Sequence, residues 1–111
     1  MQNLITLKLN KEFKRAYFQG RYKAHPLLVT YQVKNRTGGM RYGITASKKI
    51  GCAVMRNRAR RLIRQAYASL LKEGAFPSGF DYVFVARPGT PSVKMDEVKE
   101  VMQKQIRALK K

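Results

Sequence analysis

Residues 48–66, KKIGCAVMRNRARRLIRQA, predict a helix with a different chemistry on each of its two faces. An α-helix turns by about 100° per residue, so residues three or four apart share a face. The predicted apolar face consists of Met55, Ala59, Leu62, Ile63, Ala66 and Leu70. The polar face opposite consists of Arg56, Asn57, Arg60, Arg61 and Arg64, with Arg58 at its margin. We therefore expect a helix from about Ala53 to Lys72 that packs on a sheet with one side and exposes guanidinium groups on the other.

The arginines of this helix indicate a binding surface for phosphates. A guanidinium group is a planar fork that holds a phosphate through two hydrogen bonds and stacks on bases. Arg56, Arg60 and Arg64 recur every four residues, and like charges at that spacing cost an isolated helix about 0.2–0.5 kcal/mol per pair. A merely solvated helix face usually mixes both signs of charge. We therefore expect an external anion to reduce the repulsion between these arginines.

The charge of the whole chain agrees with a polyanionic partner. The chain has 24 Lys and Arg against 6 Asp and Glu, a net charge of +18. No acidic residue occurs from Phe13 to Lys72, and this segment holds 15 of the 24 basic residues. Surplus charge of one sign commonly serves association with a polyanion. Nucleic acid is the favoured partner, and an anionic membrane surface is the alternative.

Composition excludes several classes of protein. Hydrophobic residues make up 44% of the chain, too many for a disordered polycation. No apolar run approaches the roughly 18 residues of a membrane span, and the start of the chain does not resemble a secretory signal. A single cysteine and a single histidine offer neither an internal disulfide nor a cluster of metal ligands. We expect one cytoplasmic domain over residues 1–111.

The remaining elements predict an α+β fold. They are a helix over Lys11–Gln19, strands over Leu27–Lys34, Met40–Ala46 and Phe80–Ala86, and a last helix over Val93–Leu109 with Ser92 as its N-cap. Gly20 is expected to end the first helix in a left-handed conformation, and residues 35–39 to form a hairpin loop between the first two strands. The result is a single-domain two-layer α/β sandwich of order αββαβα. The strands that flank the long helix can pair in parallel, with the helix as their crossover.

The basic segment resembles the RNR signature of the bacterial ribonuclease P protein family. Arg56-Asn57-Arg58 is the signature itself, and further matching positions follow in order along the chain. They are Asn10–Phe13, Tyr31, Tyr42–Ile44, Asp81-Tyr82 and Ala86–Pro88. The resemblance implies a protein that binds a large catalytic RNA, and that together with it removes the 5′ leader of precursor tRNA by Mg²⁺-dependent hydrolysis. It also implies a left-handed β-α-β crossover, against the usual right-handed rule.

The resemblance implies two RNA-binding surfaces. The residues expected to face the catalytic RNA are Lys48, Lys49, Arg56, Asn57, Arg58, Arg60, Arg61 and Arg64. The aromatic residues expected to hold the single-stranded tRNA leader are Phe13, Tyr17 and Tyr31. Stacking of a base on an aromatic ring contributes about 1–3 kcal/mol and tolerates any sequence, as a generic leader requires. Ordinary packing between helix and sheet is an equal alternative for Phe13.

We expect the chain itself to carry no catalytic and no metal-binding residue. Its six carboxylates are scattered, and none lies in the basic segment. The Mg²⁺ of the reaction is then bound mainly by the RNA, with none bound by the protein alone. The expected partners are the catalytic RNA and precursor tRNA, with no membrane and no obligate protein partner. The alternatives are a structural RNA-binding protein such as a ribosomal component, and a DNA-binding regulator, which lacks support because no helix-turn-helix pair is evident.

Overall fold

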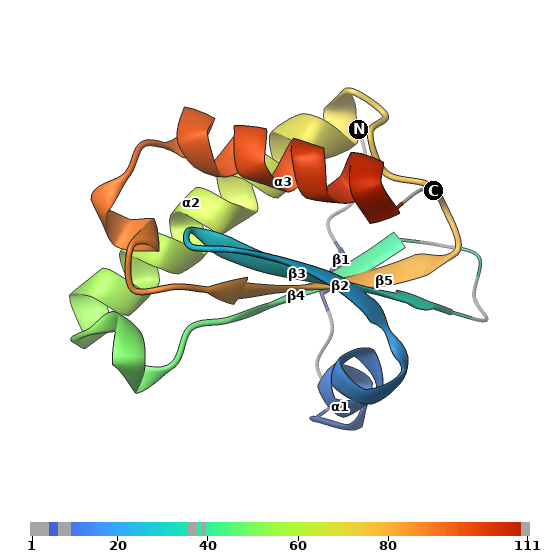
Figure 1. Cartoon of the computed structure of the whole chain (residues 1–111), viewed down its shortest axis with the longest axis horizontal. Coiled ribbons are helices and arrows are strands. Elements are labelled where there is room, and N and C mark those ends of the chain that lie inside the picture. The colour runs from blue at the N-terminus through green and yellow to red at the C-terminus, as the bar shows by residue number, and fades with distance from the viewer. Residues whose placement is uncertain (1–4, 7–9, 36–37, 39, 110–111) are drawn as a thin grey trace.

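The computed structural model describes residues 5–6, 10–35, 38 and 40–109, which form one sheet, three α-helices and two short 3₁₀ turns (Figure 1). The strands are β1 (Ile5–Thr6), β2 (Arg21–His25), β3 (Leu28–Lys34), β4 (Met40–Thr45) and β5 (Phe80–Ala86). The helices are α1 (Asn10–Gln19), α2 (Ala53–Lys72) and α3 (Met95–Leu109). The 3₁₀ turns are η1 (Lys48–Ile50) and η2 (Thr90–Ser92). The strand order is β1-β4-β5-β3-β2.

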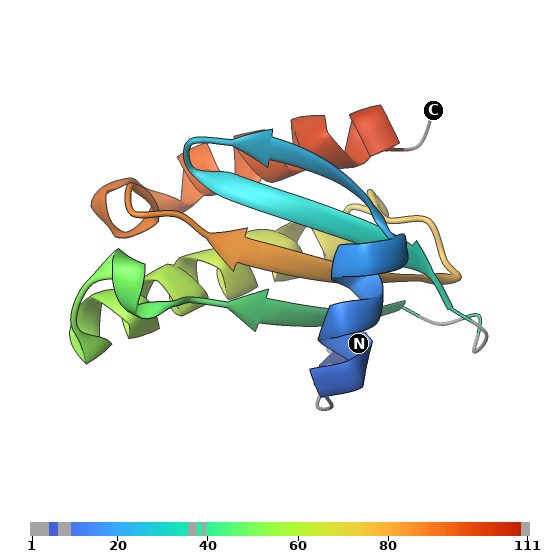
Figure 2. The ribbon, with the colours of Figure 1, turned by 60° about the horizontal axis from the view of Figure 1, so that its bottom comes forward.

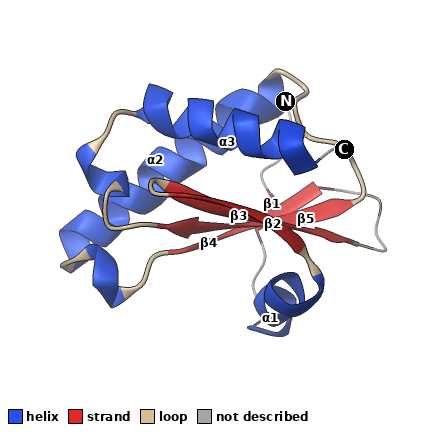
Figure 3. Ribbon diagram, viewed as in Figure 1, coloured by secondary structure: helices blue, strands red, loops and turns tan. Residues whose placement is uncertain are grey.

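The helices cover the two faces of the sheet unequally. Helices α2 and α3 lie side by side on one face, whereas α1 crosses part of the other face (Figures 1 and 3). The expected α+β class and the layer of helices on a sheet are confirmed. The expected order αββαβα omits β1 and β2, so it is short by two strands.

The strand β5 occupies the middle of the sheet, as its unbroken apolar sequence predicts. It pairs in parallel with β4 on one side and antiparallel with β3 on the other. The prediction of a hairpin between β3 and β4 is therefore wrong, because β5 lies between these two strands. A strand that is apolar on both faces is most stable where both of its edges are paired, and β3 and β4 supply those edges.

The connection from β4 through α2 to β5 is left-handed. In Figure 2 both strands run from right to left, β5 lies above β4, and α2 passes behind the sheet. A chain that follows this path turns as a left-handed screw, the rare alternative to the usual crossover. The expected handedness is thus present in the structure.

Strand β2 has no apolar alternation, and all five of its residues are exposed. It forms the true hairpin of the sheet with β3, and Pro26 lies in the turn between them. The last helix begins at Met95, two residues later than expected. Ser92 belongs to η2, so it does not cap α3. The pattern of apolar residues alone did not predict either feature.

The main core lies between the sheet and α2 with α3. Tyr67 of α2 is buried and stacks on Tyr42 of β4, with 4.4 Å between ring centroids. Buried Gln105 ties α3 to the sheet: its Oε1 accepts a hydrogen bond from the Thr30 hydroxyl, and its Nε2 donates to the carbonyl of Leu28. Aromatic packing and a satisfied polar contact therefore fix the two helices on the same face.

Gly20 separates α1 from β2, but the expected left-handed conformation is not observed there. A Cβ atom at this position would collide with the carbonyl oxygen of Ala16 and lie 2.8 Å from that of Gln32. The residue must be glycine because two backbones approach each other closely, not because of a positive φ.

Gly20→Ala is therefore expected to destabilise the domain by about 1–3 kcal/mol, the range for overpacking a close contact. Urea unfolding followed by circular dichroism measures this loss. Gln19→Ala, an exposed neighbouring change, serves as the control and should stay within about 0.5 kcal/mol of the parent protein. Equal stability of Gly20→Ala and the parent would contradict the close-approach explanation.

The buried tyrosines predict a loss of stability in alkaline solution. Burial raises the pKa of Tyr82 to about 12 and also raises the pKa of Tyr67. An unfolded tyrosine loses its proton near pH 10. The stabilisation is therefore complete below about pH 10 and falls as the pH rises towards 12, by on the order of 2 kcal/mol for Tyr82. Tyrosinate absorbance and circular dichroism should change together in this range, and ionisation of these tyrosines without unfolding would refute the assignment.

Candidate nucleic-acid interface

The exposed face of α2 carries the predicted arginines. Ala59 and Ile63 are fully buried against the sheet, whereas Arg61 and Arg64 are exposed on the opposite side of the helix. A shallow surface hollow of about 460 Å³ lies among the charged face, and its lining residues are Val54, Asn57, Arg58, Arg60, Arg61 and Arg64. The structure thus brings five of the eight residues expected to face the catalytic RNA to one hollow.

Two arginines of this surface are held by the protein itself. The Arg58 Nε donates a 2.7 Å hydrogen bond to the carbonyl oxygen of Pro91, which ties α2 to η2. The Arg60 guanidinium donates to the Asn57 side-chain oxygen at 3.1 Å. Such contacts reduce the number of orientations that each side chain samples, and so lower the entropy cost of binding an anion.

Lys48 and Lys49 lie in η1, the turn that leads into α2. The side-chain oxygen of Ser47 accepts a hydrogen bond from the Lys49 backbone, and buried Ile50 anchors the turn in the core. Gly51 follows with a φ of 135°, a conformation that other residues rarely adopt. Both lysines are exposed and extend the positive charge of α2 beyond its first turn.

The acidic residues leave this surface uncompensated. Within the described ranges, the ion pairs are Arg41–Glu12, Arg41–Asp81, Lys99–Glu73 and Lys104–Glu100. None of them involves a basic residue of η1 or of the arginine face of α2. Phosphates are the expected counterions for a row of unpaired guanidinium groups.

Aromatic side chains gather on the opposite face of the sheet. Tyr31 of β3 lies between Tyr17 of α1 and Tyr22 of β2, with ring centroids 5.0 Å and 5.4 Å away. The Tyr17 hydroxyl lies 2.9 Å from the Thr45 hydroxyl, which connects α1 to the end of β4. Tyr17 is 37% exposed and Tyr22 is 59% exposed. The three rings form an aromatic row (Tyr17, Tyr31, Tyr22) that is open to solvent.

Phe13 lies deeper than the aromatic row. It packs against a small buried cluster made of Ala16, Val33 and Val83, and its own side chain is half-buried. This position supports the core-packing alternative for Phe13, whereas Tyr17 and Tyr31 keep surface that a base can reach.

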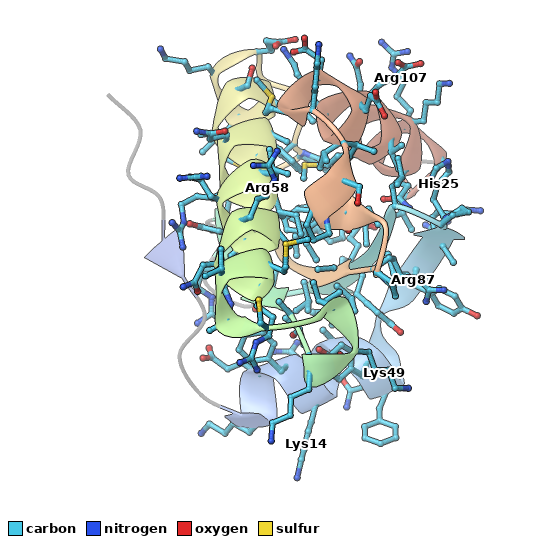
Figure 4. All side chains as sticks on the ribbon, turned by 90° about the vertical axis from the view of Figure 1, so that its left-hand side faces the viewer. Lys14, His25, Lys49, Arg58, Arg87 and Arg107 are labelled. Carbon is cyan, nitrogen blue, oxygen red and sulfur yellow. The ribbon has the colours of Figure 1, made fainter. Side chains whose placement is uncertain are left out.

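Two candidate residues were missed by the reasoning from sequence. Tyr22 lies on the strand that no apolar alternation marks, and only its pairing opposite Tyr31 reveals its place in the aromatic row. Arg87 follows the end of β5, directly beside the loop that follows β4, because Thr45 pairs with Val85. Figure 4 looks onto the ends of β4 and β5 and shows Arg87 and Lys49 on the same side of the molecule. A basic residue just after a central strand was the available signal for Arg87.

A charged cluster attaches α1 to the sheet. Arg41 donates to both carboxylate oxygens of Asp81, at 3.0 and 2.7 Å, and to the Glu12 carboxylate at 2.6 Å. Asp81 is only 2% exposed and also accepts a hydrogen bond from the Asn35 side chain. The hydrogen bond with Asp81 is the main cause that raises the pKa of Arg41. The cluster fixes the start of α1 on the sheet. It thereby also positions Tyr17, the member of the aromatic row that lies on α1.

The residues that the structure describes do not suit a magnesium site. Mg²⁺ prefers several oxygen ligands, usually one or two carboxylates with water and phosphate. In the part of the chain that the structure describes, no three His, Cys, Asp or Glu side chains come together. Asp81 and Glu12, which do approach one another, already bind Arg41. The same described residues include no helix with the length and apolarity of a membrane span.

The fold and the uncompensated charge of α2 are those of a basic α+β protein suited to a polyanionic partner. The sequence model of the family Ribonuclease P matches residues 1–110. The chain belongs to the ribonuclease P protein family. It is thus the protein component of a ribonucleoprotein endoribonuclease that acts in tRNA 5′ processing. Its partner is the ribonuclease P RNA, and that RNA performs the catalysis.

Individual relatives agree along nearly the whole chain. The ribonuclease P protein component of Alkaliphilus metalliredigens is 37% identical over 110 residues, covering 99% of this chain and 97% of the relative. That of Pelotomaculum thermopropionicum is 40% identical, covering 96% and 94%. The solved RNase P protein of Staphylococcus aureus superposes with a TM-score of 0.80 at 25% identity, covering 96% and 95%. The Thermotoga maritima protein gives 0.78 at 26% identity, covering 92% and 96%.

Arg41→Met is expected to lower the free energy of unfolding by about 3–5 kcal/mol, because it leaves the buried Asp81 carboxylate without its cation. Arg41→Lys restores the charge but not the two-pronged contact, so only part of the loss should be recovered. Lys104→Gln removes a surface pair and is the control, with an expected cost below about 1 kcal/mol. Chemical unfolding measures all three, and a loss for Arg41→Met no larger than that of the control would contradict the role of the cluster.

Proposed function

We propose that the protein holds two RNAs on opposite faces of its sheet. The face of α2 with η1 binds the catalytic RNA through Lys48, Lys49, Arg56, Asn57, Arg58, Arg60, Arg61 and Arg64. The aromatic row binds the single-stranded 5′ leader of precursor tRNA. In this proposal residues 1–111 act as one domain in the cytoplasm.

The unpaired arginines of α2 support the first contact. Arg61 and Arg64 are exposed, and neither makes an ion pair within the described residues. An RNA helix presents phosphates at regular spacing, and a row of guanidinium groups along a rigid α-helix matches such an array. The lysines of η1 and Arg58 at the margin widen the charged area across the start of the helix.

The aromatic row is the observation that carries the proposal for the leader. Three rings lie at stacking distances on a face of the sheet that α1 covers only in part. A double-stranded RNA cannot offer its bases to such rings, whereas an unpaired strand can. Stacking is independent of base identity, so the row suits leaders of many sequences. Phe13 supports the row from below and contacts a base only at its exposed edge.

This arrangement assigns binding and charge neutralisation to the protein. The reaction is a Mg²⁺-dependent hydrolysis, and the Mg²⁺ in this proposal is held by the RNA. The basic surface lowers the repulsion between two polyanions, the catalytic RNA and the substrate, when both approach one domain. The aromatic row contributes affinity to the part of the substrate that is removed, so it favours precursor over mature tRNA.

Two variants separate the contacts. Arg64→Gln should weaken binding to ribonuclease P RNA about fivefold and lower the log–log salt slope by about 0.7–0.9, as expected for one lost phosphate contact. Tyr31→Ala should leave that binding unchanged and weaken binding of precursor tRNA to the holoenzyme by about five- to a hundredfold, the range for one lost stack. Fluorescence titrations with labelled RNA measure both constants.

Tyr22→Ala is the second leader variant, because its exposed side chain can be removed without opening the core. Mature tRNA, which has no leader, is the control substrate, and its affinity should not change in either tyrosine variant. The two-surface proposal fails if Tyr31→Ala and Tyr22→Ala weaken mature and precursor tRNA equally. It also fails if Arg64→Gln leaves the affinity for ribonuclease P RNA intact.

A further inference from the structure

We propose that the outer face of α1, centred on Phe18 with Lys11 and Lys14, binds the distal part of a long single-stranded leader after it leaves the aromatic row. We call this surface the outer α1 site (Lys11, Lys14, Phe18). It deepens the proposed function and rests on it, since the leader must first occupy the row.

Phe18 is the most exposed large apolar side chain of the described residues, with 86% of its surface accessible. In α1 the buried direction is that of Ala16, which is fully covered by the sheet. Two residues further along the helix, Phe18 points about 200° away, straight into solvent. Packing within the domain therefore does not account for this ring, and exposure of an aromatic side chain in water is unfavourable.

The residues around Phe18 carry positive charge. Lys14 lies one turn before it and Lys11 two turns before it, on the same face of α1, and both are exposed. An aromatic ring flanked by cations is the combination that binds a base through stacking and the adjoining phosphates through charge. Figure 4 shows Lys14 projecting from α1 away from the rest of the molecule.

A hollow of about 590 Å³ adjoins the outer α1 site. Its lining includes Arg15, Phe18 and Gln19 of α1, together with Glu12, Arg41 and Asp81. Arg41 contacts both carboxylates and offsets one of their two charges. Lys11, Lys14 and Arg15 also line the hollow, so its lining has four basic groups against two acidic ones and remains positive toward a phosphate. The Arg15 guanidinium is held in place by a 2.6 Å hydrogen bond to the carbonyl of Lys34.

The outer α1 site is continuous with the aromatic row. Tyr17 and Phe18 are consecutive residues, and their side chains leave the helix about 100° apart. Tyr17 points toward the sheet and contacts Tyr31 of β3, whereas Phe18 faces solvent. An α-helix is about 10–12 Å across with its side chains, so a few nucleotides of extended RNA cover the distance from one ring to the other.

A protein partner or an anionic membrane would also accept an exposed phenylalanine among lysines. Single-stranded RNA is favoured because the outer α1 site adjoins the aromatic row, where the leader is proposed to lie. A long leader bound in the row therefore reaches this site without a second partner. The length of the leader then becomes a specificity feature: short leaders end in the aromatic row, and long leaders also reach α1.

The test compares precursor tRNAs whose leaders have the same sequence near the cleavage site and differ only in length. One leader is about 4 nucleotides long and ends within the row, and the other is about 12 nucleotides long, within the range that single-strand-binding domains cover. For reconstituted holoenzyme, Phe18→Ala should weaken binding of the long-leader substrate about fivefold or more and leave the short-leader substrate unchanged. Phe18→Trp, which keeps a stacking ring, should preserve the long-leader affinity.

Charge is tested by Lys14→Gln, which should weaken only the long-leader complex. Lys104→Gln on α3, which is also an exposed lysine, is the control and should change neither complex. The inference is overturned if Phe18→Ala affects both substrates equally or neither. Binding to phosphatidylserine vesicles that depends on Phe18, with unchanged long-leader affinity, would assign the site to a membrane instead. Tyr31→Ala on the short leader reports the aromatic row separately, so failure of the outer α1 site and failure of the proposed function give different results.

Discussion

Burial of β5 on both faces and at both edges is the constraint on which the arrangement of this molecule depends. Tyr82 and Phe84 point into the core under α2 and α3, while Val83 points into the small cluster under α1. Such a strand requires a neighbour on each side and a layer on each face. The neighbours are β3 and β4, and the layers are two helices on one face and a single helix on the other. A single helix cannot cover five strands, so part of the second face stays open, and this opening holds the aromatic row.

The carboxylates that form ion pairs lie away from the arginine face of α2. Glu12 and Asp81 converge on Arg41 and fix α1, and Glu73 and Glu100 pair with lysines at α3. The arginine face of α2 is consequently free of internal counterions within the described residues. A basic surface on one side and an aromatic surface on the other then follow from one sheet. The proposed division between a catalytic RNA and a single-stranded leader follows from these surfaces, because the first is recognised by its phosphates and the second by its bases.

The long-range features of the fold escaped prediction from sequence for a common reason. The pattern of α2 and the apolar run of β5 are local, and both elements were predicted with their observed bounds. The hairpin between β3 and β4 was a wrong inference from two strands joined by glycines, because a later strand pairs between them. Strand β2 is stabilised by its partner and by α3, through Gln105 and Arg21, and not by any apolar face of its own. Tertiary pairing therefore decided its state.

The sequence by itself determined that this protein has an arginine-faced helix, a buried central strand and a large surplus of positive charge, because each depends on residue type and on spacing along one element. It also carried the signature through which the family is recognised. Only the tertiary structure decided which residues meet: that Tyr22 joins Tyr17 and Tyr31, that Arg41 joins α1 to β5, and that Phe18 faces solvent. These contacts connect residues far apart in the chain, and they exist because packing around β5 brings their elements together. Periodicity within one helix predicted the arginine face, and the family resemblance implied a surface with Tyr17 and Tyr31. The contacts of Tyr22 and Arg41 and the exposure of Phe18 depend on how distant elements pack, so they could not be predicted from the sequence.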